Sequence, residues 1–321
     1  MAPRTIALLL SVLAAVALAC SSGSESVPEP GPGSPPPVQE VASDNWIQPD
    51  EIPLIKGPVS ESGLQAIFAT PDIGVGKNRF AFVLTSRTGL IRTPTATVSS
   101  IFIPEDGGGP EPKQTALAIF RPFPLVSRGL YITSLTFDTP GRWAVEIDVL
   151  DDSGVNRTVE LSFPVAETTA APKTGAAAIA SRNKTVGDVE RLSQLSTGSL
   201  LDPDLYQLTI AEAVESGLPT VVVMASPAFC TNAVCGPQVE VLQQLKDQFE
   251  GRANFIHVDF YDSPEEIQGD LDRARISPTV LEWNLPSTEW SFVIDRQGII
   301  VGRFESFTTL EELRAVLETV L

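Results

Sequence analysis

Residues 219–238 read PTVVVMASPAFCTNAVCGPQ, and this stretch decides the fold that the sequence predicts for the C-terminal part of the chain. Five apolar residues follow Thr220, with a proline before the run and another after it. A short apolar run of this kind predicts a buried central strand over 220–225. Cys230 and Cys235 follow in a loop, and Gly236-Pro237 precedes a predicted helix, since proline is tolerated in the first helical turn.

The segments on either side of this stretch continue an alternation of helix and strand. Thr209 and Glu212 have the spacing of a capping box and predict the start of a short helix. Downstream, the patterns predict a helix with one apolar face (Val241, Leu242, Leu245, Phe249), a strand (255–260), a hairpin (291–294 and 299–304 around a turn at 295–298) and a last helix that begins at Thr308 or Thr309. Residues 190–321 therefore read as a sheet covered by helices.

This order of elements resembles the thioredoxin fold over residues 190–321. The run Val222 to Cys230 is similar to the strand and aromatic-cysteine active site of that family, and residues 292–300 (FVIDRQGII) resemble the hairpin of the membrane-anchored TlpA group. The resemblance implies an α/β thioredoxin-like fold with a cis-proline at Pro286. It also implies a substrate groove made by Phe229, Leu285 and Pro286.

The resemblance further implies a thiol-disulfide oxidoreductase in which Cys230 is the nucleophile and Cys235 resolves the mixed disulfide. Exchange requires a thiolate with a lowered pKa, access and a second thiol. The sequence departs from the family because four residues separate the cysteines and because Met224 stands where thioredoxin has a buried carboxylate. Cys235-Gly-Pro-Gln238 can also be aligned with the Cys-Gly-Pro-Cys motif, so the opposite order of the two cysteines stays open.

Two other functions remain open for the same cysteines. In an exported protein, a close pair can form a fixed disulfide, which would make this a redox-silent binding or structural lipoprotein. Copper handling of the Sco type also uses paired cysteines and a histidine on this fold. His257, the one histidine, lies inside a predicted strand, where a packed or surface histidine is expected, so no metal or other cofactor is predicted.

The N-terminus predicts export and lipidation. Residues 1–20 have an early positive charge, a short apolar run and small residues before Cys20, which is typical of a secretory signal. The ending Ala-Leu-Ala-Cys20 resembles the bacterial lipoprotein box, which implies a diacylated Cys20. Residues 21–45, rich in Ser, Pro and Gly, are expected to form a tether. The predicted location is the membrane surface, facing the periplasm or the cell exterior.

Residues 46–166 show short segments of period-two alternation between turns. Aromatic and aliphatic residues alternate with polar ones (Phe80, Phe82, Leu84; Trp143, Val145, Ile147, Val149; Val159, Leu161, Phe163, Val165). About seven strands predict an immunoglobulin-like β-sandwich without a disulfide. Residues 167–189 are small and lack periodicity, so they are assigned to a linker. The predicted fold class is therefore a multidomain protein, with an immunoglobulin-like β-sandwich before the α/β thioredoxin-like region.

Charge and composition restrict the partners. The 321 residues include 22 basic and 40 acidic side chains, which gives a net charge of -18. Because a negative protein repels phosphate groups, this charge disfavours nucleic acid as a partner. Three cysteines, one histidine and two methionines supply few ligands for zinc, copper or haem. The expected partners are extracytoplasmic thiol or disulfide proteins, with the membrane reached only through the N-terminal lipid.

Overall fold

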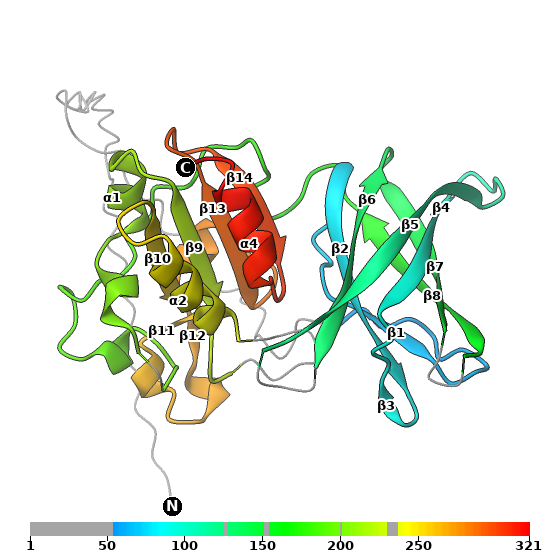
Figure 1. Cartoon of the computed structure of the whole chain (residues 1–321), viewed down its shortest axis with the longest axis horizontal. Coiled ribbons are helices and arrows are strands. Elements are labelled where there is room, and N and C mark those ends of the chain that lie inside the picture. The colour runs from blue at the N-terminus through cyan, green and yellow to red at the C-terminus, as the bar shows by residue number, and fades with distance from the viewer. Residues whose placement is uncertain (1–53, 125–127, 151–153, 200, 230–236) are drawn as a thin grey trace, which may run out of the picture. The chain divides into compact units, whose positions relative to one another are not determined.

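The computed structural model describes residues 54–124, 128–150, 154–199, 201–229 and 237–321 (Figure 1). These residues belong to one compact unit, which comprises 47–321. The predicted signal segment (1–20), its Cys20 and the predicted tether (21–45) lie outside the described residues. The signal segment and the tether therefore stay predictions.

The first half of the described chain is one antiparallel sheet of eight strands. Its hydrogen-bonded path runs β1-β2-β6-β5-β4-β7-β8, and β3 pairs with β2 off this path. The strands are β1 (Gln65–Phe68), β2 (Gly76–Ser86), β3 (Gly89–Leu90), β4 (Thr95–Ile103), β5 (Glu111–Pro122), β6 (Gly129–Phe137), β7 (Gly141–Leu150) and β8 (Asn156–Val165).

The two ends of this path approach each other. Strands β1 and β8 are in contact, and the segment before β1 runs tightly against β8. A Cβ on Gly57 would lie 2.3 Å from the carbonyl oxygen of Glu160, so only glycine fits at that crossing. The sheet is therefore nearly closed and barrel-like.

The predicted fold class, an immunoglobulin-like β-sandwich followed by an α/β thioredoxin-like fold, is wrong. The first region has one rolled sheet in place of two packed sheets. Period-two alternation shows only that each strand buries one face, and a sandwich and a barrel both satisfy that condition. The residues predicted to face inward do so, because Phe80, Trp143 and Phe163 are buried in one cluster inside this sheet.

The second half contains a four-stranded mixed sheet in the order β10-β9-β13-β14, with a separate two-stranded ribbon. Strand β10 is parallel to β9, and β13 is antiparallel to both β9 and β14. The elements are α1 (Ile210–Glu215), β9 (Thr220–Ala225), α2 (Gln238–Gln248), β10 (Asn254–Asp259), β11 (Tyr261–Asp262), β12 (Arg275–Ile276), α3 (Pro278–Glu282), β13 (Glu289–Ile294), β14 (Ile300–Glu305) and α4 (Leu310–Leu317).

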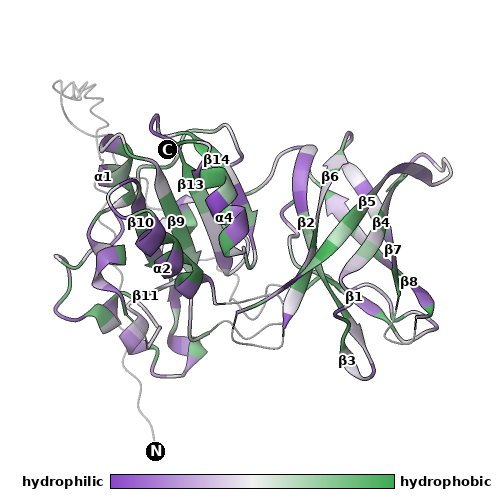
Figure 2. Cartoon of the chain, viewed as in Figure 1, coloured by the Kyte–Doolittle hydropathy of each residue, from purple (hydrophilic) through white to green (hydrophobic). Residues whose placement is uncertain are grey.

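The four-stranded sheet buries both of its faces. Alternate residues of β9 belong to two hydrophobic clusters: Val221 and Val223 pack with α2 and α4, whereas Val222 and Met224 pack with α1 and α3. Figure 2 shows the strongly hydrophobic colour of β9, next to the mixed colours of the helices α2 and α4. The predicted strand over 220–225, the capping box at Thr209 and the last helix are confirmed.

A clear α/β thioredoxin-like fold is nevertheless not shown for this region. Strands account for 39% of the chain and helices for 17%, so the molecule is mostly β. Several segments between strands form single 3-10 turns, namely η2 (Leu192–Gln194), η3 (Pro203–Tyr206), η4 (Pro264–Glu266) and η5 (Leu271–Arg273). The apolar pattern of a short segment does not distinguish such a turn from an α-helix.

Residues 167–189, assigned to a linker, make regular contacts. The backbone N–H groups of Ala170 and Ala171 donate to the carboxylate of Asp72, 2.8 and 2.9 Å away. Further along, Gly175 donates to the carbonyl oxygen of Ile300, and Ala177 forms an isolated bridge with Ile299. Residues 175–178 thus lie along the free edge of β14.

Candidate functional site

Cys230 and Cys235 lie outside the described residues, but the elements on both sides of them are described. Strand β9 ends at Ala225, completely buried, and α2 begins at Gln238. The structure therefore defines the two anchors of the cysteine loop.

A buried carboxylate lies where β9 ends. Asp259 is the last residue of β10 and the register partner of Ala225, and its side chain is 3% exposed. The backbone N–H and the hydroxyl of Thr197 donate to its Oδ2 at 2.7 and 2.9 Å. The Thr197 hydroxyl also lies 2.9 Å from that of Ser226 and accepts the backbone N–H of Ala228 at 3.2 Å. Asp259 is thus connected to the two residues that lead into the cysteine loop.

This carboxyl group can exchange a proton near neutral pH. Burial raises the pKa of Asp259 to about 6, against the hydrogen bonds from Thr197, Tyr261 and Ser226, which lower it. The group also lines a cavity of about 170 Å³, together with Arg182, Lys184 and residues of α3. A proton held by Asp259 therefore has a polar environment next to it.

His257 is a packed residue, as the sequence predicts. Its Nδ1 lies 2.7 Å from the hydroxyl of Tyr206 and its Nε2 lies 3.0 Å from the carbonyl oxygen of Ala225. Burial lowers the pKa of His257 to about 4, so the ring is neutral at pH 7. Both ring nitrogens are occupied, and the imidazole stabilises the end of β9.

The three residues predicted to form a substrate groove lie in different environments. Phe229 is half-buried and meets Tyr261 edge-on at a ring separation of 5.8 Å. Leu285 packs against the same hydrophobic cluster, whereas Pro286 is exposed. All peptide bonds within the described ranges are trans, that of Leu285–Pro286 included, so the expected cis-proline is wrong.

The first residue of α2 is a buried glutamine. The side-chain Oε1 of Gln238 accepts the backbone N–H of Thr308 at 2.7 Å. Its Nε2 has no hydrogen-bond partner in the part of the chain that the structure describes, although the residue is 1% exposed. Pro237 supplies no side-chain cap to the helix. A free amide donor therefore lies at the start of α2, three residues after Cys235.

A metal centre finds no support among the residues that the structure describes, where no three His, Cys, Asp or Glu side chains form a group that could hold an ion. In the same ranges, no helix is long and apolar enough to cross a membrane.

Sequence reasoning missed Asp259 and the role of Gln238 as a buried donor. Asp259 carries a weak signal, because a carboxylate that ends an apolar strand must be hydrogen-bonded or protonated. Gln238 appears in the sequence only as the residue that takes the place of a second cysteine in an alternative alignment. Its hydrogen-bond partner, Thr308, is 70 residues away in the sequence.

Comparisons with known proteins add little to this description. No family model matches the chain, and no curated protein matches it. Among solved structures, the chain is similar to the soluble domain of PmoD from Methylocystis sp. ATCC 49242 (Rockwell), with 17% identity over 30% of this chain and 78% of that chain and a TM-score of 0.22. A similarity this low carries no argument about fold or function.

Proposed function

We propose that the protein is a lipid-anchored extracytoplasmic thiol-disulfide oxidoreductase that acts through Cys230 and Cys235. The observation that supports this proposal is the buried carboxylate of Asp259, hydrogen-bonded through Thr197 to the backbone of Ala228. Exchange needs a group that takes up a proton from a thiol near neutral pH, and the pKa of Asp259 suits that task.

In the proposed reaction, the thiolate of Cys230 attacks a disulfide of an exported protein. A bond forms between Cys230 and one partner sulfur, and the other partner sulfur leaves as a thiolate. Cys235 then loses its proton to Asp259 and attacks Cys230, which releases the second partner thiolate. The partner gains two electrons, and the Cys230-Cys235 disulfide forms; the reverse sequence oxidises a dithiol partner.

The reduction potential of the cysteine pair tests this function. The full chain in detergent is equilibrated in defined thiol buffers, and the fraction of alkylated Cys230 and Cys235 is read by peptide mass spectrometry. We expect a potential between about -120 and -270 mV, the range of exchange proteins. A potential below about -300 mV would instead identify a structural disulfide and contradict the proposal.

A trapping experiment provides the second test. In the Cys235→Ser variant, the mixed disulfide between Cys230 and a partner cannot be resolved, so an adduct that dithiothreitol releases is expected. The Cys230→Ser variant is the matched control, and it also reports the opposite order if it alone forms the adduct. Absence of an adduct in both variants, with reduced stability, would favour the disulfide staple.

The location is proposed from the sequence of the N-terminus. A Cys20→Ser variant should lose the lipid-dependent mass increase and leave the membrane fraction. The wild-type protein in spheroplasts should be accessible to added protease, because the proposed orientation faces away from the cytoplasm.

A further inference from the structure

The cavity beside the end of β10 has charged groups both at its mouth and on its floor. Its volume of about 170 Å³ is close to the ~150 Å³ of an engineered cavity that holds benzene, so a molecule of about six or seven non-hydrogen atoms fits. The exposed Arg182 and Lys184 line it together with Asp259 and Thr279, which are 3% and 4% exposed. The exposed side chains therefore mark the mouth, and the buried ones mark the floor.

On the floor, the carboxylate of Asp259 lacks a cation. Its Oδ2 accepts the N–H and the hydroxyl of Thr197, and its Oδ1 accepts the N–H of Tyr261 at 3.1 Å. These donors are neutral, and Asp259 takes part in none of the ion pairs between described residues. Each carboxylate oxygen accepts about two hydrogen bonds, so Oδ1 keeps a lone pair. Because a buried carboxylate is costly without a counter-charge, a cation that enters the cavity is stabilised beside it.

The neighbouring polar groups on the floor are neutral. The Nε2 of His257 lies 3.0 Å from the carbonyl oxygen of Ala225, which can only accept a hydrogen bond, so Nε2 carries the proton. Nδ1 therefore accepts the hydroxyl of Tyr206 at 2.7 Å. Thr279 adds a neutral hydroxyl group. Among the described residues, Asp259 is thus the one charged group on the floor, and its charge is negative.

The mouth supplies a positive charge for the outer end of a ligand. The Nζ of Lys184 already pairs with the carboxylate of Asp262 at 2.5 Å. Arg182 belongs to none of the ion pairs in the described part of the chain, and a guanidinium binds a carboxylate through two parallel hydrogen bonds. Leu195 and Val258 add apolar surface to the wall. A fitting molecule therefore has a carboxylate at one end, a few methylene groups and a cation at the other end.

We propose that this cavity binds a small ω-amino acid, with its ammonium group at Asp259 and its carboxylate at Arg182. An ammonium group has three N–H donors, and the Oδ1 of Asp259 and the hydroxyls of Ser277 and Thr279 provide acceptors on the floor. The site goes beyond the proposed thiol function. None of the residues assigned to it belongs to the cysteine loop.

Three probes that share one carbon chain test the two charges separately. Saturation-transfer NMR titrations of the full chain in detergent compare γ-aminobutyrate, butylamine and butyrate, and protein-free micelles give the background. We expect γ-aminobutyrate to bind, and butylamine to bind about threefold more weakly, because the contact with Arg182 is exposed. Butyrate should bind more than about tenfold more weakly, because it leaves Asp259 without a cation. Absence of saturation transfer to γ-aminobutyrate would overturn the inference, and so would equal affinity for butyrate.

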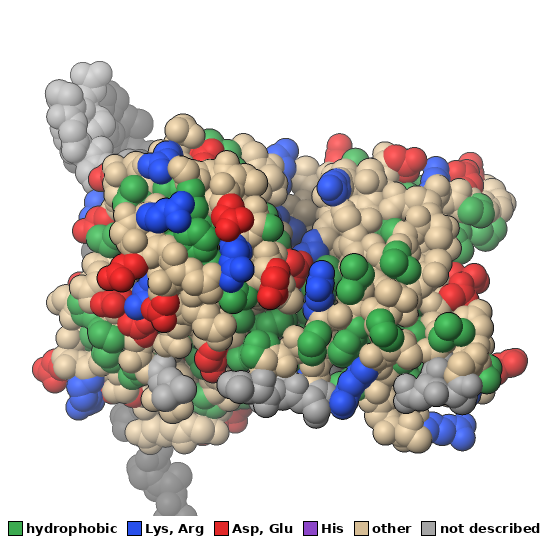
Figure 3. Space-filling view, viewed as in Figure 1, with side chains coloured by type: hydrophobic (Ala, Val, Ile, Leu, Met, Phe, Trp, Pro, Cys, Tyr) green, Lys and Arg blue, Asp and Glu red, His purple; other side chains and the backbone are tan. Residues whose placement is uncertain are grey.

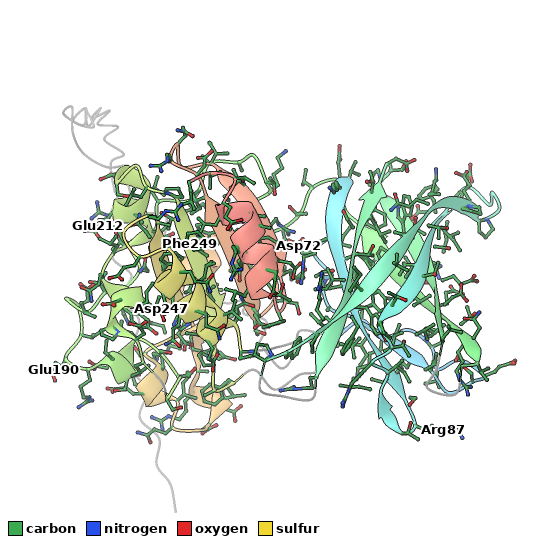
Figure 4. All side chains as sticks on the ribbon, viewed as in Figure 1. Asp72, Arg87, Glu190, Glu212, Asp247 and Phe249 are labelled. Atoms are coloured by element: carbon green, nitrogen blue, oxygen red, sulfur yellow. The ribbon has the colours of Figure 1, made fainter. Side chains whose placement is uncertain are left out.

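Two variants test the same contacts from the side of the protein. Asp259→Asn should weaken binding of γ-aminobutyrate by about tenfold or more, and Arg182→Gln by about threefold. Asp247→Asn and Arg87→Gln are the matched controls at exposed positions labelled in Figure 4, and both should bind as the wild-type protein does. Wild-type affinity in Asp259→Asn would contradict the site. If Asp259→Asn does not fold, the comparison of butyrate with γ-aminobutyrate on the wild-type protein decides the same point.

The outcome is separable from that of the proposed function. The Cys230→Ser variant performs no thiol exchange, yet it should bind γ-aminobutyrate with the wild-type affinity. Binding in a protein whose cysteine pair has the potential of a structural disulfide would contradict the function and leave the ligand site standing. Loss of binding in Cys230→Ser would contradict the placement of the ligand in this cavity.

Discussion

At the scale of single residues, the carboxylate of Asp259 carries the proposed proton transfer. Asp259 and Gln238 are polar residues that the fold buries, and each has a partner far away in the sequence: Thr197 for Asp259 and Thr308 for Gln238. Residue type alone does not indicate burial. The burial and hydrogen bonding of both side chains therefore depend on the assembled fold.

The ionisation of Asp259 should make folding depend on pH. Its pKa is 3.8 in the unfolded chain and about 6 in the folded protein, so the folded state binds the proton more tightly. The resulting stabilisation is complete below pH 4 and is lost as the pH rises through 6. Between pH 4 and 7, the free energy of unfolding of the wild-type protein should fall by about 2 kcal/mol relative to that of Asp259→Asn. Urea unfolding curves of both proteins at a series of pH values measure this difference.

Asp247→Asn is the control for this prediction, because Asp247 is an exposed carboxylate on α2, labelled in Figure 4. The free energy of unfolding of Asp247→Asn should change with pH as that of the wild-type protein does. Parallel curves for wild type and Asp259→Asn would mean that the buried carboxyl does not hold a proton near neutrality.

At the scale of elements, the helices α1 and α4 are short and depend on their N-terminal caps. Both α1 and α4 begin with a complete capping box, in which Thr209 pairs with Glu212 and Thr309 with Glu312. These boxes satisfy backbone N–H groups that would otherwise lack partners. Because the helices have six and eight residues, each cap contributes a large share of helix stability.

Thr309→Ala should lower the free energy of unfolding by about 1 kcal/mol, since the Glu312 N–H loses its acceptor. Thr209→Ala should have a similar effect at α1. Urea denaturation measures both. Thr319→Ala, beyond the end of α4, serves as the control, and an equal loss there would show that the effect is not one of N-capping.

Several elements could be predicted from local pattern. The strand over 220–225, the helix after Gly236-Pro237 and the hairpin at 295–298 appear as expected, because apolar runs and turn residues act locally. The arrangement of strands in the first region could not be predicted. Alternation assigns faces to strands but does not say whether β1 meets β8, which depends on the accumulated twist of the whole sheet.

At the scale of the whole molecule, an ionic cluster joins distant segments. Asp72 pairs with Arg303 of β14 and accepts the N–H groups of Ala170 and Ala171. Its own N–H donates to Glu305, which also accepts the hydroxyl of Ser287 at 2.6 Å. Figure 4 labels Asp72, and Figure 3 shows acidic and basic side chains close together on the visible face.

Glu305 should make this cluster sensitive to pH. Burial raises the pKa of Glu305 to about 7 from 4.5, and Asp72 adds to this effect while Arg303 opposes it. The folded state favours the protonated form, so the stabilisation is complete below pH 4.5 and is lost as the pH rises through 7. Between pH 4.5 and 8, the free energy of unfolding of the wild-type protein should fall by about 3 kcal/mol relative to that of Glu305→Gln.

Thermal and urea unfolding of wild type and Glu305→Gln at a series of pH values test this expectation. Glu160→Gln, an exposed position on β8, is the control and should show the wild-type dependence. A constant difference between wild type and Glu305→Gln would contradict the assignment of the titration to this carboxyl.

The sequence by itself determined that the segments around Phe80, Trp143 and Val159 and residues 220–225 become strands, that helices begin near Thr209, Pro237 and Thr309, and that the alternating apolar residues of these strands point into a core. These properties follow from the period of apolar residues and from capping and turn chemistry, which act over a few residues. The tertiary structure alone decided that the first region rolls into one nearly closed sheet and that Asp72 joins β14 to residues 170 and 171. It also decided that Asp259, Gln238 and Glu305 are buried. Burial and pairing of such groups depend on contacts between residues far apart in the chain, for which local pattern carries no information.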